Sequence, residues 1–289
     1  MDYFNYSFDF GQNNVEKYEL LNKIGEGANG EVYKAKRNED NSIVAIKYLN
    51  YSGSKSRRRF ENEIEIYRKL WNCPFIIKIL DYSLDSFKPY LVMEFCQHGN
   101  ARNQTNLFIN NHSLGVGLLL GAVEGIRQIH SLNTYHRDIK PDNLLLTTDA
   151  FGNYILKLGD AGMSCFLPDS SIFSNATYSL QGTPSYIAPE LFHGKAFSAA
   201  ADVFSLGVTC HELLTGIRPF AGQKVTRGPI EMRNLIERMI SDDSRKRPTI
   251  EQVISEMKIA FNQISFNQKA GDFATGLFKA GAVFGAVIL

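Results

Sequence analysis

The hydrophobic pattern of this chain changes near residue 100, and this change most constrains its fold. From Tyr18 onward, apolar residues come in short β-type runs broken by glycine-rich or Asn- and Asp-containing turns, with one helical pattern at Phe60–Leu70. Beyond residue 110 helical patterns dominate, at Leu118–Ile129, Asp202–Leu214 and Glu231–Ile240. A small β-rich part followed by a larger helical part predicts an α+β fold of two lobes with a cleft between them.

Five short apolar runs are the predicted strands of the first lobe: Leu20–Leu21, Glu31–Tyr33, Ile43–Ile46, Ile76–Leu80 and Tyr90–Phe95. The residues before them are rich in Asn, Tyr and Phe without clear periodicity. The sequence therefore predicts four parts: an irregular lead-in at residues 1–17, an N-lobe at 18–94, a C-lobe at 95–262 and an apolar C-terminal tail at 263–289.

Charge and cysteine content exclude several classes of protein. The chain has 31 Lys and Arg against 30 Asp and Glu, a net charge of +1, whereas dedicated nucleic-acid binders usually carry a strong basic excess. The four cysteines form no C-x-x-C pair, so neither a zinc ribbon nor a redox dithiol is indicated. A reduced, cytoplasmic-type compartment fits best, and the acidic N-terminus does not resemble a signal peptide.

The segment Gly25–Val32 has the pattern G-x-G-x-x-G-x-V. Glycines let backbone N–H groups approach phosphate oxygens without interference from a Cβ atom. A dinucleotide-binding fold uses a similar triplet, but it leads into a helix, whereas here Val32–Ala35 continues as a strand pattern. A plain tight turn is the remaining alternative for this segment taken alone.

A lysine, Lys47, ends the apolar run Val44–Ile46. A lysine in a buried strand needs an anion, which ATP phosphates or a helix carboxylate can supply. Glu63 lies on the following predicted helix and is a candidate for this carboxylate, with Glu61 and Glu65 as rivals.

The segment His136–Asn143 carries the most specific chemistry, with the sequence HRDIKPDN. Asp138 can accept a hydroxyl proton, and Lys140 can neutralise charge on a phosphoryl group in transfer. Asn143 can hold a metal ion from the same loop. A purely structural role is a poor explanation for this combination.

Two later segments, Gly159–Gly162 and Gly182–Glu190, complete an ordered set of motifs. With them the sequence resembles the eukaryotic-type protein kinase family over residues 18 to about 260. Lys140 and Thr183 match its serine/threonine branch. The resemblance implies the bilobal kinase fold, ATP and Mg²⁺ as cofactors, and transfer of phosphate to serine or threonine in a protein substrate.

The resemblance also implies a role for individual residues. The catalytic set is Asp138, Lys140, Lys47 and Glu63, and the magnesium ligands are Asn143 and Asp160. The residues expected to contact ATP are Gly25, Glu26, Gly27, Gly30, Val32, Ala45, Lys47, Met93, Glu94, Cys96 and Leu145. Among these, Met93 resembles the gatekeeper and Glu94–Cys96 the hinge. Glu190 and Arg247 resemble a structural ion pair, and Asp202 a brace for the catalytic loop.

The sequence departs from the family pattern in three places. Ala161 stands where a phenylalanine is usual, and Phe204 where a tryptophan is usual. The stretch between Phe220 and Leu235 is too short for the usual substrate-side helix, which puts conventional substrate docking in doubt. We hypothesise that the ring of Tyr67 fills the space left beside Ala161. A pseudokinase scaffold is the alternative function, and a small-molecule kinase is a weaker one.

Phosphorylation between Gly162 and Gly182 gives a further expectation. A phosphate on Ser179 could bind Arg137 and Arg59, although Ser174, Thr177 or no residue at all are alternative sites.

The tail from Phe273 to Leu289 carries a single charge and is too short to span a membrane. We expect a soluble, cytoplasmic protein whose catalysis does not depend on the tail. Membrane contact through the tail, with Gly281 and Gly285 at a small-x-x-x-small spacing, is the less favoured alternative. The oligomeric state is left open.

Overall fold

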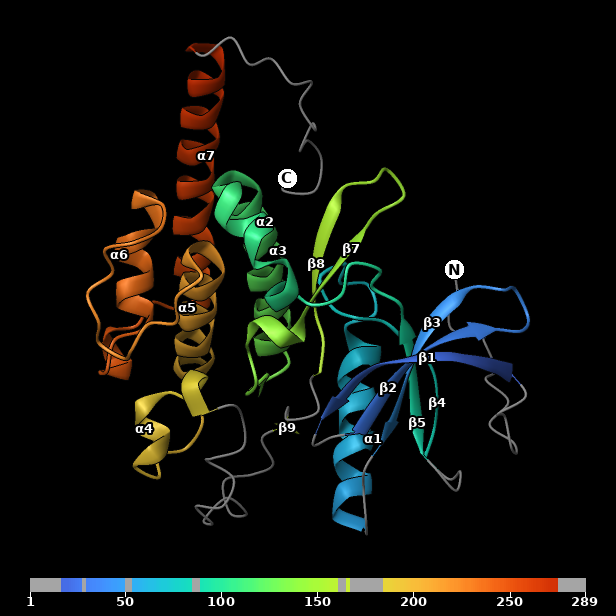
Figure 1. The fold of residues 1–289 in the computed structure, drawn as a ribbon. Coiled ribbons are helices and arrows are strands. Elements are labelled where there is room, and N and C mark those ends of the chain that lie inside the picture. The colour runs from blue at the N-terminus through green and yellow to red at the C-terminus, as the bar shows by residue number, and fades with distance from the viewer. Residues whose placement is uncertain are drawn as a thin grey trace, which may run out of the picture. The chain divides into compact units, whose positions relative to one another are not determined.

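The chain divides into two compact units. The computed structural model describes residues 17–27, 30–49, 54–84, 89–160, 165–166 and 184–274. The first unit holds the described residues of Met1–Ile64 and Lys78–Phe95, and the second holds those of Glu65–Ile77 and Cys96–Leu289. The five-stranded β-sheet lies in the first unit and most helices lie in the second, which confirms the predicted α+β, bilobal class (Figure 1). The units divide one residue later than the predicted boundary, and Glu65–Ile77 belongs with the second.

A five-stranded antiparallel sheet forms the first unit. Its strands are β1 (Tyr18–Gly27), β2 (Gly30–Arg37), β3 (Ile43–Leu49), β4 (Ile79–Ser83) and β5 (Tyr90–Glu94), in the order β1-β2-β3-β5-β4. Three of the five predicted runs lie within these strands, and a fourth, Tyr90–Phe95, extends one residue beyond β5. The glycine-rich segment leads into β2, so the helix that a dinucleotide-binding fold requires at this point is excluded.

The prediction for β4 was wrong by about three residues, since Ile76–Leu80 was expected and Ile79–Ser83 is found. The preceding residues bind elsewhere, within the second unit. The Ile77 N–H donates to the Leu158 carbonyl at 3.0 Å, and the Leu158 N–H donates to the Phe75 carbonyl at 2.8 Å. The Phe75 ring lies so close to Gly121 that an added Cβ would stand 2.7 Å from it. These hydrogen bonds and this contact occupy the segment that the apolar pattern assigned to a strand.

The two faces of the sheet differ in chemistry. One face carries the core of the unit: Tyr18, Ala35, Val44, Ile46, Tyr90 and Val92. The residues on the other face follow from the strand register. Val32 lies opposite Lys47, and Ala45 lies opposite Met93, in neighbouring antiparallel strands. Directly opposed residues project to the same side of a sheet. The register therefore gathers these four candidate ATP-contacting residues on one face.

Helix α1 (Ser54–Lys69) begins before the predicted Phe60–Leu70 pattern and ends beside its last residue. Its buried apolar side chains include Phe60, Ile64 and Tyr67, which follow the i, i+4, i+7 spacing of one helix face. That spacing explains why the sequence alone identified this helix.

Helices dominate the second unit. They are α2 (Thr105–Asn110), α3 (His112–Ser131), α4 (Pro189–Phe192), α5 (Ala199–Thr215), α6 (Ile230–Met239) and α7 (Ile250–Ala274). Short strands complete the unit: β6 (Thr134–Tyr135) pairs with β9 (Cys165–Phe166), and β7 (Leu144–Thr148) pairs with β8 (Tyr154–Leu158). Every residue of α5 from Ala201 to Leu214 is buried, so this helix is surrounded by protein on all sides. Helix α3 packs against α5, α7 and β8.

The segment before α6 is short, as the sequence indicated. Residues 216–229 form turns and bends without a helix, and α6 begins at Ile230. Helix α7 instead runs across the predicted boundary at residue 263. Ile264 is buried, and the Ser265 hydroxyl lies 2.6 Å from that of Ser113 on α3. The remaining tail, residues 275–289, lies outside the described residues. Among the helices that the structure describes, none combines the length and apolar character needed to cross a membrane.

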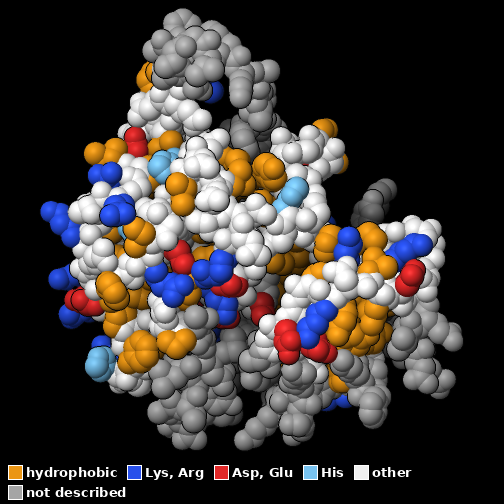
Figure 2. Space-filling view, in the orientation of Figure 1, with side chains coloured by type: hydrophobic (Ala, Val, Ile, Leu, Met, Phe, Trp, Pro, Cys, Tyr) orange, Lys and Arg blue, Asp and Glu red, His pale blue; other side chains and the backbone are white. Residues whose placement is uncertain are grey.

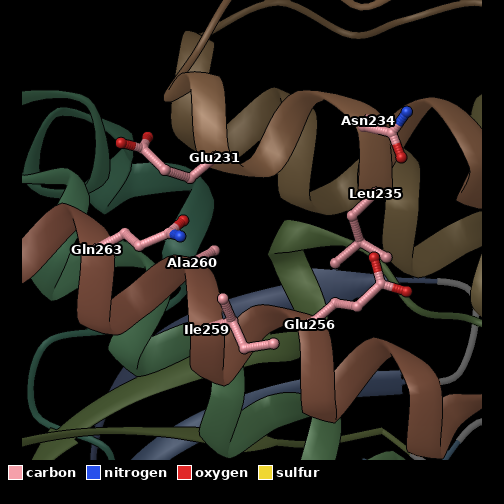
Figure 3. Close-up of a pocket in the computed structure, with 7 residues that line it drawn as sticks. All are labelled: Glu231, Asn234, Leu235, Glu256, Ile259, Ala260 and Gln263. Carbon is pink, nitrogen blue, oxygen red and sulfur yellow. The ribbon is translucent and has the colours of Figure 1, made fainter.

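A cavity of about 180 Å³ lies between α6 and α7 (Figure 3). Leu235 and Ile259 contribute apolar lining, while Glu231 on α6 and Glu256 on α7 contribute carboxylates at separate places around it (Figure 3). None of the residues predicted to bind ATP or magnesium lines it. This cavity is therefore not the candidate active site.

Candidate active site

The glycine-rich hairpin joins β1 to β2. Gly30 has φ +137°, and a Cβ there would stand 1.8 Å from the Tyr48 carbonyl oxygen, so only glycine fits. Among the described residues, no atom would lie within 4 Å of a Cβ at Gly27, which is compatible with the approach of a ligand to the backbone. Lys23 bridges Glu26 at 2.6 Å and Glu31 at 2.8 Å. The Glu26 carboxylate is thus engaged within the hairpin.

The structure distinguishes among the three candidate glutamates of α1. Glu61 and Glu65 are exposed and pair with Arg57 and Lys69 along the helix surface. Glu63 is 2% exposed, and Lys47 on β3 is 7% exposed. Both belong to the first unit, and among its described residues Glu63 is the only buried carboxylate. A buried lysine is stable as a cation only beside an anion, which favours Glu63 over its neighbours.

The four remaining predicted contacts are distributed over both units. Met93 and Glu94 end β5, and the Glu94 carboxylate accepts a hydrogen bond from the Lys78 N–H at 2.8 Å. Cys96, in the second unit, is buried, and Leu145 on β7 packs against Gly159, where an added Cβ would lie 3.2 Å from it.

In the second unit, the predicted catalytic residues meet around one carboxylate. The Lys140 ammonium donates to Oδ2 of Asp138 at 2.7 Å, and the Asn143 amide donates to the same oxygen at 2.9 Å. Asn143 also donates to the Asp138 backbone carbonyl at 2.7 Å. The two donors hold the Asp138 carboxylate in a fixed orientation. The residue is only 9% exposed, so water has little access to replace them.

His136 connects this loop to the segment that carries Asp160. The Asp138 N–H donates to Nδ1 of His136 at 3.3 Å, so Nδ1 is an acceptor and the proton resides on Nε2. That Nε2–H donates to the Gly159 carbonyl at 3.1 Å, and the Gly159 N–H donates to the Asn143 carbonyl at 2.8 Å. Asp160 itself has φ +53°, a left-handed backbone conformation that is uncommon outside glycine and often marks functional sites.

Asp202 on α5 braces the loop, as the resemblance implied. Its carboxylate accepts the N–H groups of His136 and Arg137, both at 2.9 Å, and lies 2.8 Å from Nε2 of His130. Burial alone would raise the pKa of this carboxyl group. The hydrogen bond from His130, the one from the Arg137 N–H and the nearby imidazole charges together outweigh that effect, so the pKa is lowered and the carboxylate stays charged. Arg137, whose N–H donates to Asp202, has φ +70°, which is in the left-handed region.

The predicted ion pair between Glu190 and Arg247 is confirmed. Two parallel hydrogen bonds of 2.7 Å join the guanidinium to the carboxylate, and both side chains are buried. The guanidinium also lies 4.9 Å from the centre of the Phe204 ring, the position at which the family usually has tryptophan. An aromatic contact is therefore preserved.

The two candidate magnesium ligands suit a hard cation. The amide nitrogen of Asn143 is committed to Asp138, which leaves Oδ1 as the atom available to a metal ion. Asp160 adds a carboxylate, and magnesium commonly uses one or two protein ligands together with substrate phosphates and water. No cluster of three or more His, Cys, Asp or Glu suited to a metal ion occurs among the described residues, so a closed all-protein cage is not found there.

Several predictions concern residues that the structure does not describe. Ala161, Thr183, Ser174, Thr177 and Ser179 lie outside the described residues, as does the side chain of Arg59. Tyr67 is described and is 3% exposed. Its proposed packing against Ala161 stays a prediction, as does the activating phosphate.

One group of residues beside the loop was missed by the sequence analysis. Arg102 hydrogen bonds to Asp142, Glu212 and Tyr186, which come from three separate segments. No spacing rule connects residues so far apart in the chain. The only local signal was Asp142, an acid next to Asn143 in the most specific motif.

Comparison with known proteins gives the same picture. The model of the protein kinase domain family matches residues 18–257. An Aurora/IPL1-related protein kinase 2 from Caenorhabditis elegans is 32% identical over 84% of this chain and 83% of its own length. An Aurora kinase from Schizosaccharomyces pombe is 29% identical over 89% of this chain and 76% of its own.

A third relative, the serine/threonine-protein kinase ste20 of Aspergillus fumigatus, is 32% identical over 76% of this chain, which spans only 25% of that protein. The family match extends from the first residue of β1 into α7 and includes both the glycine-rich hairpin and the Asp138 loop. This chain belongs to the protein kinase domain family.

Proposed function

We propose that this protein transfers the γ-phosphoryl group of ATP to serine or threonine hydroxyls of protein substrates. The observation that carries the proposal is the environment of Asp138, whose carboxylate is oriented by Lys140 and Asn143. Relatives named as serine/threonine-protein kinases and Aurora kinases support the same substrate class.

The residues divide the chemistry among them. Asp138 accepts the proton of the substrate hydroxyl while the hydroxyl oxygen attacks the γ-phosphorus. The bond from that phosphorus to the β–γ bridging oxygen breaks, and ADP leaves. Lys140, 2.7 Å from Asp138, stabilises negative charge on the transferred group. In the first unit, Lys47 binds the α- and β-phosphates and Glu63 orients it, while backbone N–H groups of the glycine-rich hairpin cover the phosphates.

Magnesium, bound by Asn143 Oδ1 and the Asp160 carboxylate, would neutralise the phosphate oxygens of ATP. His136 maintains the connection between those two ligands, because it hydrogen bonds to the Gly159 carbonyl, and the Gly159 N–H donates to the Asn143 carbonyl. The metal ligands are thereby tied to the loop that holds the catalytic base.

The adenine ring is expected to contact Val32, Ala45, Met93, Cys96 and Leu145, with the hinge at Glu94–Cys96. We further propose a cytoplasmic, soluble protein that acts in signalling and binds no nucleic acid. The net charge of +1 supports the absence of nucleic-acid binding, and on the face shown in Figure 2 basic and acidic side chains are interspersed.

Incubation of the purified chain with γ-labelled ATP, Mg²⁺ and a generic protein substrate tests the proposal. We expect label on serine and threonine, identified by acid hydrolysis of the product, and no transfer when EDTA removes the metal. Label on a small molecule alone would contradict the proposed substrate class.

The alternative is a pseudokinase scaffold. The absence of a helix in residues 216–229 favours it to the extent that substrate docking depends on such a helix. The two functions differ in one readout. A scaffold would bind partners without transferring label to any substrate, whereas an enzyme turns over ATP repeatedly.

A further inference from the structure

Arg102 lies in a short 3-10 helix, Ala101–Gln104, and contacts three other segments of the second unit. Its Nε and Nη2 atoms each donate to one oxygen of Asp142 at 2.8 Å. Its Nη1 donates to Glu212 at 2.9 Å, and Nη2 also donates to the Tyr186 hydroxyl at 2.6 Å. One guanidinium therefore holds together the catalytic loop, the end of α5 and the segment before α4.

The contact with Asp142 is the one that reaches the catalytic residues. Asp142 is the middle residue of the 3-10 helix Pro141–Asn143, between Lys140 and Asn143. A two-point contact from a planar guanidinium fixes both the position and the plane of a carboxylate. The next residue, Asn143, donates its side chain to Asp138. The orientation imposed on Asp142 is thus passed along the turn to the candidate base.

The other end of the contact is anchored in the core. Glu212 is 8% exposed and belongs to the buried helix α5. It accepts a second set of hydrogen bonds from Arg218, at 3.2 and 3.3 Å, and one from the Tyr186 hydroxyl at 2.5 Å. Arg218 also covers the Tyr186 ring at 4.7 Å. Two arginines balance two carboxylates, so this half-buried cluster carries no net charge.

Loss of Arg102 affects the two carboxylates differently. Glu212 would keep Arg218 and Tyr186 as partners. Asp142, by contrast, receives both of its described side-chain hydrogen bonds from Arg102. Without the guanidinium, the Asp142 carboxylate loses these two hydrogen bonds. We expect it to turn toward water to replace them and to displace the turn Pro141–Asn143.

We propose that Arg102 is a positioning residue that fixes the turn Pro141–Asn143 and, through it, Asn143 and Asp138. Its effect on phosphoryl transfer rests on the proposed function. Its effect on the turn does not. Arg102 is not among the residues proposed to bind ATP or magnesium, and its link to Asn143 and Asp138 runs through Asp142.

The test compares Arg102→Gln and Arg102→Lys with a matched control, Arg127→Gln. Arg127 is similarly exposed, 37% against 34%, and contacts a single carboxylate, Glu124 on its own helix. We expect Arg102→Gln to lower kcat about tenfold while the KM for ATP changes less than about twofold, because the misplaced groups act in the transition state. Lysine keeps the charge but not the fork and should recover only part of the loss. The control should match the wild type.

Hydrogen exchange provides a readout that needs no catalysis. The Asn143 N–H donates to the Lys140 carbonyl, and the Leu144 N–H donates to the Pro141 carbonyl. Both amides should exchange faster in Arg102→Gln than in the wild type or in Arg127→Gln. The double variant Arg102→Gln, Asp142→Asn should lose no more activity than the single change, because both act through one contact.

The outcomes separate the two proposals. Wild-type exchange at these amides in Arg102→Gln overturns the positioning role, whether or not the enzyme turns over. A lower melting temperature with unchanged kcat and unchanged exchange also overturns it, because the role would then be purely structural. Faster exchange together with an inactive wild type would support positioning and count against the proposed function alone.

Discussion

The glycine-rich hairpin and the Asp138 loop both carry charged residues, but the two regions hold them in different ways. In the hairpin, Lys23 and Glu26 pair at the surface, and a Cβ at Gly27 would meet none of the described residues within 4 Å. In the loop, Asp138 is buried with two donors, and Asp202 accepts two backbone N–H groups from beneath. Exposed ion pairs contribute little to stability, whereas buried and fully hydrogen-bonded groups fix geometry. We therefore infer that the loop fixes the positions of its side chains, whereas the hairpin leaves its backbone open to a ligand.

The largest expected effect is catalytic and comes from the segment that His136 ties to the loop. Asp160→Asn should lower kcat by orders of magnitude, since charge neutralisation dominates phosphoryl transfer. The far-ultraviolet circular dichroism spectrum should remain that of the wild type. Steady-state kinetics with saturating ATP and Mg²⁺ provide the measurement, and near-normal turnover would refute the assignment of Asp160 as a metal ligand.

A change beneath the loop should cost stability as well as activity. In Asp202→Ala, the N–H groups of His136 and Arg137 lose their acceptor, at a cost of about 1–3 kcal/mol for each buried group. Urea denaturation measures the difference in the free energy of unfolding.

The matched control for this change is Asp149→Ala at the β7–β8 turn. Asp149 also accepts two backbone N–H groups, from Phe151 and Asn153, but it does so at the surface. Water can replace it there, so this variant should be much closer to the wild type. Equal losses in the two variants would mean that burial is not what distinguishes the loop.

Acid should weaken the cluster around Arg102 before it affects the apolar core. The pKa values of Asp142 and Glu212 are both lowered. Burial raises them, but the hydrogen bonds and charge of Arg102 at Asp142, and the combined hydrogen bonds of Arg218, Tyr186 and Arg102 at Glu212, together with other nearby charges, outweigh it. A carboxyl group with a lowered folded-state pKa stabilises the fold above its usual pKa and loses that contribution as the pH falls. The difference in unfolding free energy between the wild type and Arg102→Gln should therefore be largest near about pH 7 and shrink below about pH 4. A difference that is constant across this range would show that the carboxylates are not its source.

The smallest effect is expected in the hairpin. Lys23→Gln removes an exposed pair and should leave the melting temperature and the KM for ATP nearly unchanged, because surface ion pairs are screened by water and salt. A clear rise in KM would indicate that the ion pairs shape the phosphate-covering loop, and the contrast between the two regions would then need revision.

Local patterns predicted much of this structure. The i, i+4, i+7 spacing of Phe60, Ile64 and Tyr67 was enough to identify α1, and alternation with turn residues identified β1, β2, β3 and β5. Strand β4 was displaced because the Phe75–Ile77 segment binds α3 and Leu158, a tertiary preference that a run of apolar residues does not reveal.

The candidate site was predicted in the same uneven way. Motif spacing was enough to find Asp138, Lys140 and Asn143, and resemblance supplied Asp202 as the brace. The helix pattern alone left Glu61, Glu63 and Glu65 open. The resemblance chose Glu63, and its burial beside two exposed neighbours supports that choice. Arg102 escaped notice because its partners Asp142, Tyr186 and Glu212 come together only in the folded chain.

The most direct test of the account compares the wild type with Asp138→Asn on a peptide array with labelled ATP. Asparagine keeps the size of the side chain but accepts no proton, so it isolates the role assigned to the carboxylate. We predict that the wild type phosphorylates peptides with serine or threonine acceptors and that Asp138→Asn retains ATP binding while losing transfer by orders of magnitude. Equal phosphorylation by both proteins, or none by a wild type that binds ATP, would contradict the claim that this loop is the centre of an active kinase.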